Sequence, residues 1–306
     1  PIPGGRLKLL LLGANGQVGW ELQRALAPLG EVVALDHDSA GARRADFREP
    51  ESLAALVQAA APDVIVNAAA HTAVDKAESE PDLARAINAT APGVLARAAA
   101  ARGALLVHYS TDYVFDGSGD QPRAEDAATG PLSVYGQTKL EGEHAVQAGT
   151  PHHLIFRTSW VYGARGQNFP KTMVRLAQER DALRVIDDQV GAPTGADLLA
   201  DLTAHAVRAT LANPALAGTY HAVAAGFASW HGVATLAIDT ARQLRPDLPW
   251  KVQRIDPSPT TEYPTPARRP LNSRLDTTRL RTAFGCHLPG WETGVRRMLT
   301  EHLRPS

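Results

Sequence analysis

Tyr135 and Lys139 form a pair whose residue types and spacing suggest acid–base catalysis. They lie in the stretch VYGQTKLEGE, within a segment expected to be helical, and residues four apart on a helix share one face. A phenol with its ordinary pKa of about 10 exchanges protons poorly at neutral pH. An ammonium group at ~4 Å, in an effective dielectric of ~20, would lower that pKa by about three units. The pair therefore predicts a phenol that is activated by a cation and serves as a proton donor.

A hydroxyl group that holds the substrate oxygen next to the phenol would complete such a site. The stretch HYSTDYVF offers Ser110 and Thr111 at the end of an apolar run over 104–110. Neighbouring residues of a strand face opposite ways, so only one of the two can point into the site. The residues alone leave this choice open.

Three glycines, Gly13, Gly16 and Gly19, lie between the first apolar run and the first helical pattern. Their spacing is GxxGxxG, which differs from the GxGxxG of many dinucleotide-binding turns. Glycines at this place allow a tight turn, a close approach of backbone N–H groups to a pyrophosphate, and close packing of the helix that follows. The turn therefore predicts nucleotide binding.

Asp36 ends the second apolar run, where a carboxylate can accept hydrogen bonds from an adenosine ribose diol. That position favours NADH. Arg43 and Arg44 follow within reach of a 2′-phosphate, which would suit NADPH. The predicted cofactor is therefore NADPH or NADH.

The elements that must position these residues alternate along the chain. Apolar runs of strand length are continuous, as is typical of strands covered on both faces, and they lie at 7–13, 31–36, 63–70, 104–110 and 153–159. Helical patterns rich in Ala, Leu, Glu, Gln and Arg lie between them, at 17–28, 51–61, 82–102 and 133–148. This alternation predicts an α/β fold with a Rossmann-like, doubly wound parallel sheet.

Beyond residue 160 the regularity weakens and proline-rich turns appear, as in RPDLPWK and IDPSPTTEYPTPARRP. Helical patterns persist at 168–180, 197–211, 230–244 and 291–303. We therefore expect a dinucleotide-binding domain over 1–160 and a smaller α+β lobe over 161–306. A segment at about 195–225 is expected to return to the first sheet.

Composition narrows the classes of partner. The 306 residues carry a formal net charge of −1, which gives no bulk attraction to nucleic acid or to anionic membranes. A single cysteine, Cys286, cannot form an internal disulfide, and no apolar run reaches the length of a membrane span. We expect a cytosolic protein that binds neither nucleic acid nor membranes, with a fold that begins after Arg6.

Several longer stretches carry a resemblance to a known family: GANGQVGWELQRALAP, DVIVNAAAHTAVDKAESEP, HYSTDYVFDG, VYGQTKLEGE, LIFRTSWVYG, DDQVGAPTGADLLAD, YPTPARRPLNSRLDT and RRMLTEHL. From residue 7 to about 303, the chain resembles the extended short-chain dehydrogenase/reductase superfamily and, within it, the dTDP-4-dehydrorhamnose reductase family. The resemblance implies that NADPH or NADH reduces the C4 ketone of dTDP-4-dehydro-L-rhamnose to give dTDP-L-rhamnose. It also implies that the 161–306 lobe binds the dTDP-sugar.

Carried over by position, the resemblance implies Thr111 as the hydroxyl, Tyr135 as the acid that protonates the developing alkoxide, and Lys139 as its partner. Sugar-nucleotide contacts are implied for Thr111, Asp112 and Trp160, and Arg269 or Arg268 is expected near the diphosphate. The implied cofactor site consists of Tyr135 and Lys139 together with Gly13, Asn15, Gly16, Gln17, Val18, Gly19, Asp36, Asp46, Phe47, Ala70, His71, Thr72 and Tyr109.

Some members of this family are dimers that hold Mg²⁺ between subunits with acidic residues. The matching positions are Glu21, Asp197 and Glu301, with a shorter side chain at position 197. The resemblance therefore implies a homodimer with Mg²⁺ at its interface. The alternative for isolated carboxylates on helices is solvated charge.

Three other functions fit parts of the pattern. Related nucleotide-sugar 4,6-dehydratases share the Tyr–Lys pair but carry Thr-Asp-Glu where this chain has Thr111, Asp112 and Tyr113. A related 4-epimerase would keep its nicotinamide bound and recycle it. A non-catalytic NADP-binding regulatory subunit, of the kind that serves methionine adenosyltransferase, would act only as a partner protein. The presence of Thr111, Tyr135 and Lys139 together favours catalysis.

Overall fold

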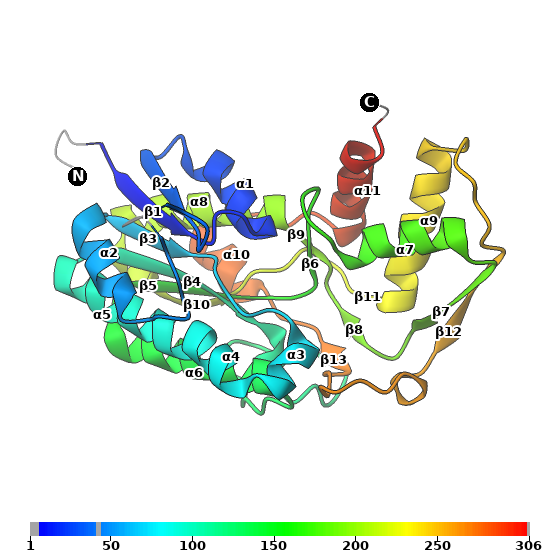
Figure 1. Ribbon diagram of the computed structural model, residues 1–306, viewed down its shortest axis with the longest axis horizontal. Coiled ribbons are helices and arrows are strands. Elements are labelled where there is room, and N and C mark those ends of the chain that lie inside the picture. Colours follow the sequence, from blue (N-terminus) through cyan, green and yellow to red (C-terminus); the bar gives the residue numbers. More distant parts are fainter. Residues whose placement is uncertain (1–5, 41–43, 305–306) are drawn as a thin grey trace.

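The centre of the fold is a parallel sheet of six strands in the computed structural model, which describes residues 6–40 and 44–304 (Figure 1). The strand order is β10-β5-β4-β3-β1-β2, and every neighbouring pair is parallel. Because β2 and β3 lie on opposite sides of β1, the order reverses between β1 and β3, where open α/β sheets bind ligands. The predicted doubly wound parallel sheet is confirmed. The strands are β1 (Lys8–Leu12), β2 (Glu31–Leu35), β3 (Val64–Asn67), β4 (Leu105–Thr111), β5 (His153–Thr158) and β10 (Gly218–His221).

Helices cover both faces of this sheet because its strands are apolar on both sides. On one face, Leu9 and Leu11 of β1 pack in a cluster with α1 (Gln17–Leu26), α8 (Ala196–Ala212) and α10 (Thr278–Phe284). On the other face, Leu10 and Leu12 pack with α2 (Ser52–Ala60) and α5 (Ala91–Arg102). The segment expected to return to the sheet supplies α8 and β10.

The predicted helix over 82–102 is confirmed, but its centre is π-helical, which the sequence analysis did not predict. The chain forms α4 (Pro81–Arg85), a π-helical turn (Ala86–Thr90) and then α5. Pro92 lacks the N–H that would bond to the carbonyl of Asn88, and the backbone N–H of Ala91 instead reaches back five residues to Ala86. The turn also brings the carbonyl of Asn88 close to α6 (Val134–Gly149). A Cβ on Gly142 of that helix would lie 2.1 Å from the Asn88 carbonyl oxygen.

The helix that carries Tyr135 and Lys139, α6 (Val134–Gly149), has a firmly held N-terminus. The Ser133 hydroxyl accepts a hydrogen bond from Gly136 N at 3.2 Å, as an N-cap does. Glu78, on α3 (Val74–Ser79), accepts from Val134 N at 2.8 Å. These bonds fix where α6 begins and hence where its catalytic face points.

The second lobe is built from short strands and from the helices α7, α9 and α11, which pack around two apolar clusters of their own (Figure 1). β8 lies between β11 and β13, β7 pairs with β12, and β6 pairs with β9. None of the helices in the described part of the chain is long and apolar enough to span a membrane. The elements not yet given are β6 (Val161–Tyr162), α7 (Phe169–Glu179), β7 (Ala182–Ile186), β8 (Val190–Gly191), β9 (Thr194–Gly195), β11 (Ala228–Ser229), α9 (Trp230–Leu244), β12 (Arg254–Ser258), β13 (Asn272–Ser273) and α11 (Trp291–His302), with short 3₁₀ turns at Asp112–Val114, Pro214–Leu216 and Thr260–Glu262.

Candidate active site

A cavity of about 460 Å³ opens at the carboxyl ends of the strands and is lined by residues of both lobes. Its wall also includes residues that the sequence did not indicate, chiefly Val74, Tyr113 and Trp230. The structure thus brings glycine-turn and catalytic-pair residues that are far apart in sequence to one space. The predicted residues that line it are Gly16, Gln17, Val18, Ala70, Thr72, Tyr109, Thr111, Asp112, Tyr135, Lys139 and Trp160.

The glycine turn has the geometry that a bound pyrophosphate requires. Gly13 has a φ of +82°, and a Cβ there would lie 2.6 Å from Ala69 N; a Cβ on Gly19 would lie 2.0 Å from the carbonyl oxygen of Gly13. Gly16 begins α1 without any side chain that caps its free N–H groups. The uncapped, positive end of α1 therefore faces the cavity and fits a diphosphate.

A second, smaller cavity of about 270 Å³ fits the adenosine end of the cofactor. Asp36, Asp46 and Phe47 line it, and Asp36 accepts hydrogen bonds from Asn15 N at 2.9 Å and His37 N at 2.7 Å. The guanidinium of Arg44 lies 2.7 Å from Asp46 and so pairs with that carboxylate. Arg43 lies outside the described residues.

The segment that should line the nicotinamide side is held by buried amides. Asn67 accepts from Ala69 N at 3.1 Å, and Asn88 of the π-helical turn bonds both His71 N (2.8 Å) and His71 O (3.1 Å). Ala70 and Thr72 face the main cavity. The His71 side chain is buried, does not line the cavity, and lies 3.5 Å from Glu80.

Lys139 is a buried cation, only 2% exposed, whose ammonium donates to the carbonyl oxygen of Tyr109 at 2.6 Å. Burial lowers the pKa of Lys139 to about 8, while the carboxylate of Glu143 acts in the opposite direction. The ammonium keeps two further N–H donors for groups that enter the cavity. Lys139 thus sits close to the balance between its charged and neutral forms.

The pKa of Tyr135 departs from the expectation. Burial raises it to about 12, the hydroxyl of Thr111 lowers it, and Asp112 raises it. The predicted lowering by Lys139 is wrong for the chain without ligands, because its ammonium is directed at a backbone carbonyl and loss of water dominates. The phenol is therefore protonated at neutral pH but is a weaker acid than the sequence predicted, so proton donation would depend on a cation that stabilises the phenolate.

Ser110 and Thr111 both line the cavity, but the contacts of their hydroxyl groups differ. The Thr111 hydroxyl interacts with the Tyr135 phenol and lowers its pKa against the larger effect of burial. The same hydroxyl accepts from Tyr113 N at 3.2 Å and donates to Asp112 at 3.2 Å. The Ser110 hydroxyl is buried and has no hydrogen-bond partner among the described residues. Thr111 is thus the hydroxyl next to the phenol.

Asp112 is a buried carboxyl at the same edge. It is 2% exposed, and burial raises its pKa to about 7, against hydrogen bonds from Ser273 and Thr111 that lower it. One of its oxygens has no protein partner in the described part of the chain. An unpartnered buried polar atom that lines a cavity is a ready contact for a ligand hydroxyl.

Two tryptophans form a flat wall of the cavity. Trp160 stacks on Trp230 with ring centroids 3.7 Å apart and planes 13° from parallel. Trp160 has a φ of +50°, a left-handed conformation that costs free energy in a bulky residue and is typical of functional sites. No sequence pattern indicated Trp230 as a site residue; it only begins the helix expected over 230–244.

The two arginines expected near the diphosphate do not line the cavity. Arg268 is exposed, and Arg269 makes a two-pronged ion pair with Asp75 of α3, at 3.0 and 2.7 Å. The Arg269 side chain also interacts with the phenol of Tyr113. The Tyr113 ring packs edge-on against the Tyr135 ring. The guanidinium therefore ties the second lobe to α3 beside the catalytic helix.

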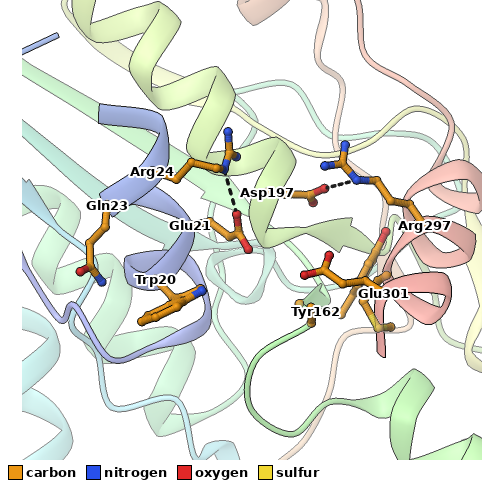
Figure 2. A pocket seen from close by; sticks show the side chains of 11 residues that line it. Trp20, Glu21, Gln23, Arg24, Tyr162, Asp197, Arg297 and Glu301 are labelled. Atoms are coloured by element: carbon orange, nitrogen blue, oxygen red, sulfur yellow. Dashed lines mark hydrogen bonds and ion pairs between the residues drawn. The ribbon is translucent and has the colours of Figure 1, made fainter. Parts of the chain in front are cut away.

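The carboxylates proposed for Mg²⁺ lie elsewhere, on α1, α8 and α11 around a separate cavity of about 530 Å³ (Figure 2). Figure 2 shows Glu21 next to Arg24 (3.3 Å) and Asp197 facing Arg297 (3.7 Å). Across residues 6–40 and 44–304, no group of three or more His, Cys, Asp or Glu side chains is placed to hold a metal ion. The described residues of one chain thus do not form a metal site by themselves, and Mg²⁺ between two subunits stays a prediction without support.

The class of protein follows from where the catalytic pair lies. Tyr135 and Lys139 share one cavity with the uncapped N-terminus of α1, at the switch point of a doubly wound sheet. This is the arrangement of a nicotinamide-dependent oxidoreductase of the Rossmann type.

Comparison with known proteins narrows the class. The model of one family, the RmlD substrate binding domain, matches residues 7–304, and the chain belongs to this family. It is 57% identical to dTDP-4-dehydrorhamnose reductase of Salmonella typhimurium (96% of this chain, 98% of the relative) and 56% identical to that of Escherichia coli K12, with the same coverage. A solved dTDP-4-dehydrorhamnose reductase from Bacillus anthracis, in complex with NADP, is similar with a TM-score of 0.86 and 34% identity, over 97% of this chain and all of that one. The resemblance seen in the sequence is confirmed.

Proposed function

We propose that this protein reduces the C4 ketone of dTDP-4-dehydro-L-rhamnose to give dTDP-L-rhamnose, with NADPH or NADH as the reductant. The observation that carries this is the meeting of Thr111, Tyr135 and Lys139 in one cavity with the glycine turn. The relatives' names supply the substrate. The 161–306 lobe would hold the dTDP-sugar, and the 1–160 domain, with the return segment, the cofactor.

The cofactor, when bound, supplies a hydride to the ketone carbon. The chain would hold its diphosphate on the free N–H groups of Gly16, Gln17 and Val18 at the start of α1. Asp36 would take the adenosine ribose, and the ammonium of Lys139 would donate to the nicotinamide ribose. Ala70 and Thr72 would line the nicotinamide side.

Tyr135 would supply the proton. Its high pKa keeps the phenol protonated at neutral pH, so that O–H donates to the alkoxide that forms at C4. The single O–H of Thr111, which donates to Asp112 in the structure, would turn to the same oxygen and hold it beside the phenol. The ammonium of Lys139 would stabilise the phenolate left behind, and the phenolate then regains its proton from solvent.

The nearby residues suit a sugar nucleotide. Asp112 offers an unpartnered oxygen to a sugar hydroxyl, and the Trp160–Trp230 stack offers a flat apolar surface to a ring. The position that a dehydratase fills with Glu is held by Tyr113, which packs edge-on against Tyr135 at 5.4 Å. An elimination that needs that extra acid has no group to run it here.

The test is the loss of nicotinamide absorbance with dTDP-4-dehydro-L-rhamnose, for wild type and Tyr135→Phe. We expect turnover by wild type and a decrease in kcat of roughly 10² or more in the variant, since a positioned proton donor is worth about that factor. Tyr263→Phe, which removes a hydroxyl from an exposed tyrosine, is the matched control.

Cofactor binding separates the alternatives. A reductase must release its oxidised cofactor in each turnover, whereas an epimerase would retain it through gel filtration. Wild-type protein that binds NADPH or NADH but never consumes it would contradict the proposal and favour the regulatory subunit.

A further inference from the structure

Glu143 lies one helical turn beyond Lys139, so that Tyr135, Lys139 and Glu143 occupy successive turns on one face of α6. Its side chain is 1% exposed, a rare state for a carboxylate. Arg157 of β5, 5% exposed, grips it with two bonds, Nε to Oε1 at 2.9 Å and Nη2 to Oε2 at 2.7 Å. This ion pair is the layer directly behind the catalytic lysine.

Arg157 is itself fully held. Its third nitrogen, Nη1, donates to the carbonyl oxygen of Glu125 at 2.9 Å, and its guanidinium lies over the ring of Phe115 at 5.2 Å. Glu125 in turn accepts from His221 N at 2.9 Å. The arginine therefore cannot swing away, and Glu143 has one available position.

A buried ion pair of this kind is weak evidence for stability by itself, because the cost of removing two charges from water can exceed their attraction. An apolar pair would fill the same space at no such cost. The location of the pair, next to the one buried ammonium of the active-site cavity, indicates another use.

We propose that Glu143, clamped by Arg157, is a positioning residue that holds a fixed negative charge one helical turn from the ammonium of Lys139 and stabilises it there, and so extends the Tyr–Lys pair to a Tyr–Lys–Glu face of α6. The proposal rests on the proposed function for its catalytic meaning. The effect of Glu143 on the protonation of Lys139 does not depend on that function and can be measured on the protein without a substrate.

The charges around Lys139 support this assignment. On its own helix it faces Tyr135, protonated, and Glu143; on β4 it faces His108, whose pKa is held well below its usual value by burial and by Lys139, so that the ring is neutral. Behind Glu143 lies Arg157, with Glu125 and His221 beyond it, and the pKa of His221 is lowered to about 3, so it too is neutral. Glu143 is thus the carboxylate that offsets the burial of the ammonium.

The direct test is a titration by NMR of protein labelled at the lysine Cε, in wild type and Glu143→Gln. The chain has few lysines, so Lys139 can be assigned by comparison with Lys139→Arg; the others are Lys8, Lys76, Lys171 and Lys251. We expect the midpoint of Lys139 to move to lower pH in Glu143→Gln by on the order of one unit, the scale of one partly compensated buried charge. Glu141→Gln, on the same helix but paired with Arg85 at the surface, should leave it unchanged.

The kinetic counterpart is the pH profile of kcat/KM. Its alkaline limb should move to lower pH in Glu143→Gln, while activity at pH 6 stays within a few-fold of wild type; a merely structural role would lower activity at every pH. Should Glu143→Gln fold poorly, Glu143→Leu combined with Arg157→Met removes the pair without leaving an unpaired charge, and it should show a shift in the same direction but smaller, because the cation is removed with the carboxylate. An unshifted Lys139 midpoint in a folded variant would overturn the proposal. A shifted midpoint in a protein without turnover would instead refute the reductase function alone.

Discussion

The two ends of the nucleotide site each contain a covered carboxyl group, and the two groups behave in opposite ways. Asp46, at the adenosine end, is 5% exposed, and the hydrogen-bonding guanidinium of Arg48 holds its pKa well below the usual range. Asp112, at the catalytic end, is 2% exposed, and burial without a cation raises its pKa to about 7. Asp46 thus carries a fixed charge because guanidinium groups pair with it near the surface, whereas Asp112 titrates because it lies deep in the protein without a cation beside it.

The same contrast distinguishes the end of the site that would bind the cofactor from the end at which the reaction would take place. The adenosine end needs unchanging charges to recognise a ribose. The catalytic end holds Asp112 with a pKa of about 7 and Lys139 with a pKa of about 8, both within reach of neutral pH. Groups poised in this range are typical of sites that handle protons. Substitutions at the two ends should therefore differ in how their effects depend on pH.

The largest effect is expected from Lys139→Met, which removes the buried ammonium. We expect kcat to fall by roughly 10² at neutral pH, because the phenolate left on Tyr135 loses its stabilising cation. Wild type should itself lose activity above about pH 8, since the active form of Lys139 is protonated and its pKa is about 8. Lys139→Arg keeps the charge beyond pH 12 or so, and should lose the alkaline limb while it retains part of the activity.

The matched control for these variants is Lys76→Met, which removes a lysine with an exposed side chain on α3. Its pH profile should equal that of wild type. An alkaline limb that persists unchanged in Lys139→Arg would show that another group titrates there.

A smaller effect is expected from Asp112→Asn. We expect a loss in kcat/KM of roughly tenfold, the scale of one hydrogen bond to a buried charged partner. Any change in kcat/KM near pH 7 in wild type should disappear, because the amide cannot titrate. Steady-state kinetics from pH 5.5 to about 9 would check this. Asp116→Asn, at an exposed carboxylate nearby, should keep the wild-type profile, and loss of the same feature there would contradict the assignment to Asp112.

The sequence patterns predicted features that depend on residues close together along the chain. The glycine turn, the helical spacing of Tyr135 and Lys139, and the continuous apolar strands each depend on a few neighbouring residues, and the structure places them as expected. The π-helical turn was missed because Ala, Leu and Arg dominate 82–102 and indicate a helix, while Pro92 changes the hydrogen bonding through a carbonyl four residues earlier. The direction of the Tyr135 pKa was missed because spacing gives a distance to a cation but not the burial of the phenol.

The contacts that no pattern indicated are those between distant segments. Arg269 meets Asp75, and Trp230 meets Trp160, only after the second lobe has folded against the first. Arg157 reaches Glu143 because β5 packs beside α6; both residues lie in stretches that carry the family resemblance, but nothing in either stretch pairs them. A sequence pattern can indicate a buried ion pair only when its two residues lie close together along the chain. The pair of Glu143 and Arg157 was therefore not predicted.

The smallest effect is expected at the adenosine end, from Asp46→Asn, and it should be one of stability. Because the pKa of Asp46 is lowered in the folded chain, its carboxylate contributes stability above the unfolded pKa of about 3.9, and that contribution is lost as pH falls below this value. The variant should therefore have a Tm a few degrees below wild type at pH 7, with a deficit that shrinks toward pH 3 or so.

Asp82→Asn, at an exposed carboxylate on α4, should show no such deficit. The midpoint of the alkaline kinetic limb should stay that of wild type, because Lys139 sets it. A Tm deficit of equal size at low pH would mean that the ion pairs of Asp46 with Arg44 and Arg48 are not its cause, and the contrast between the two ends would then rest on the catalytic end alone.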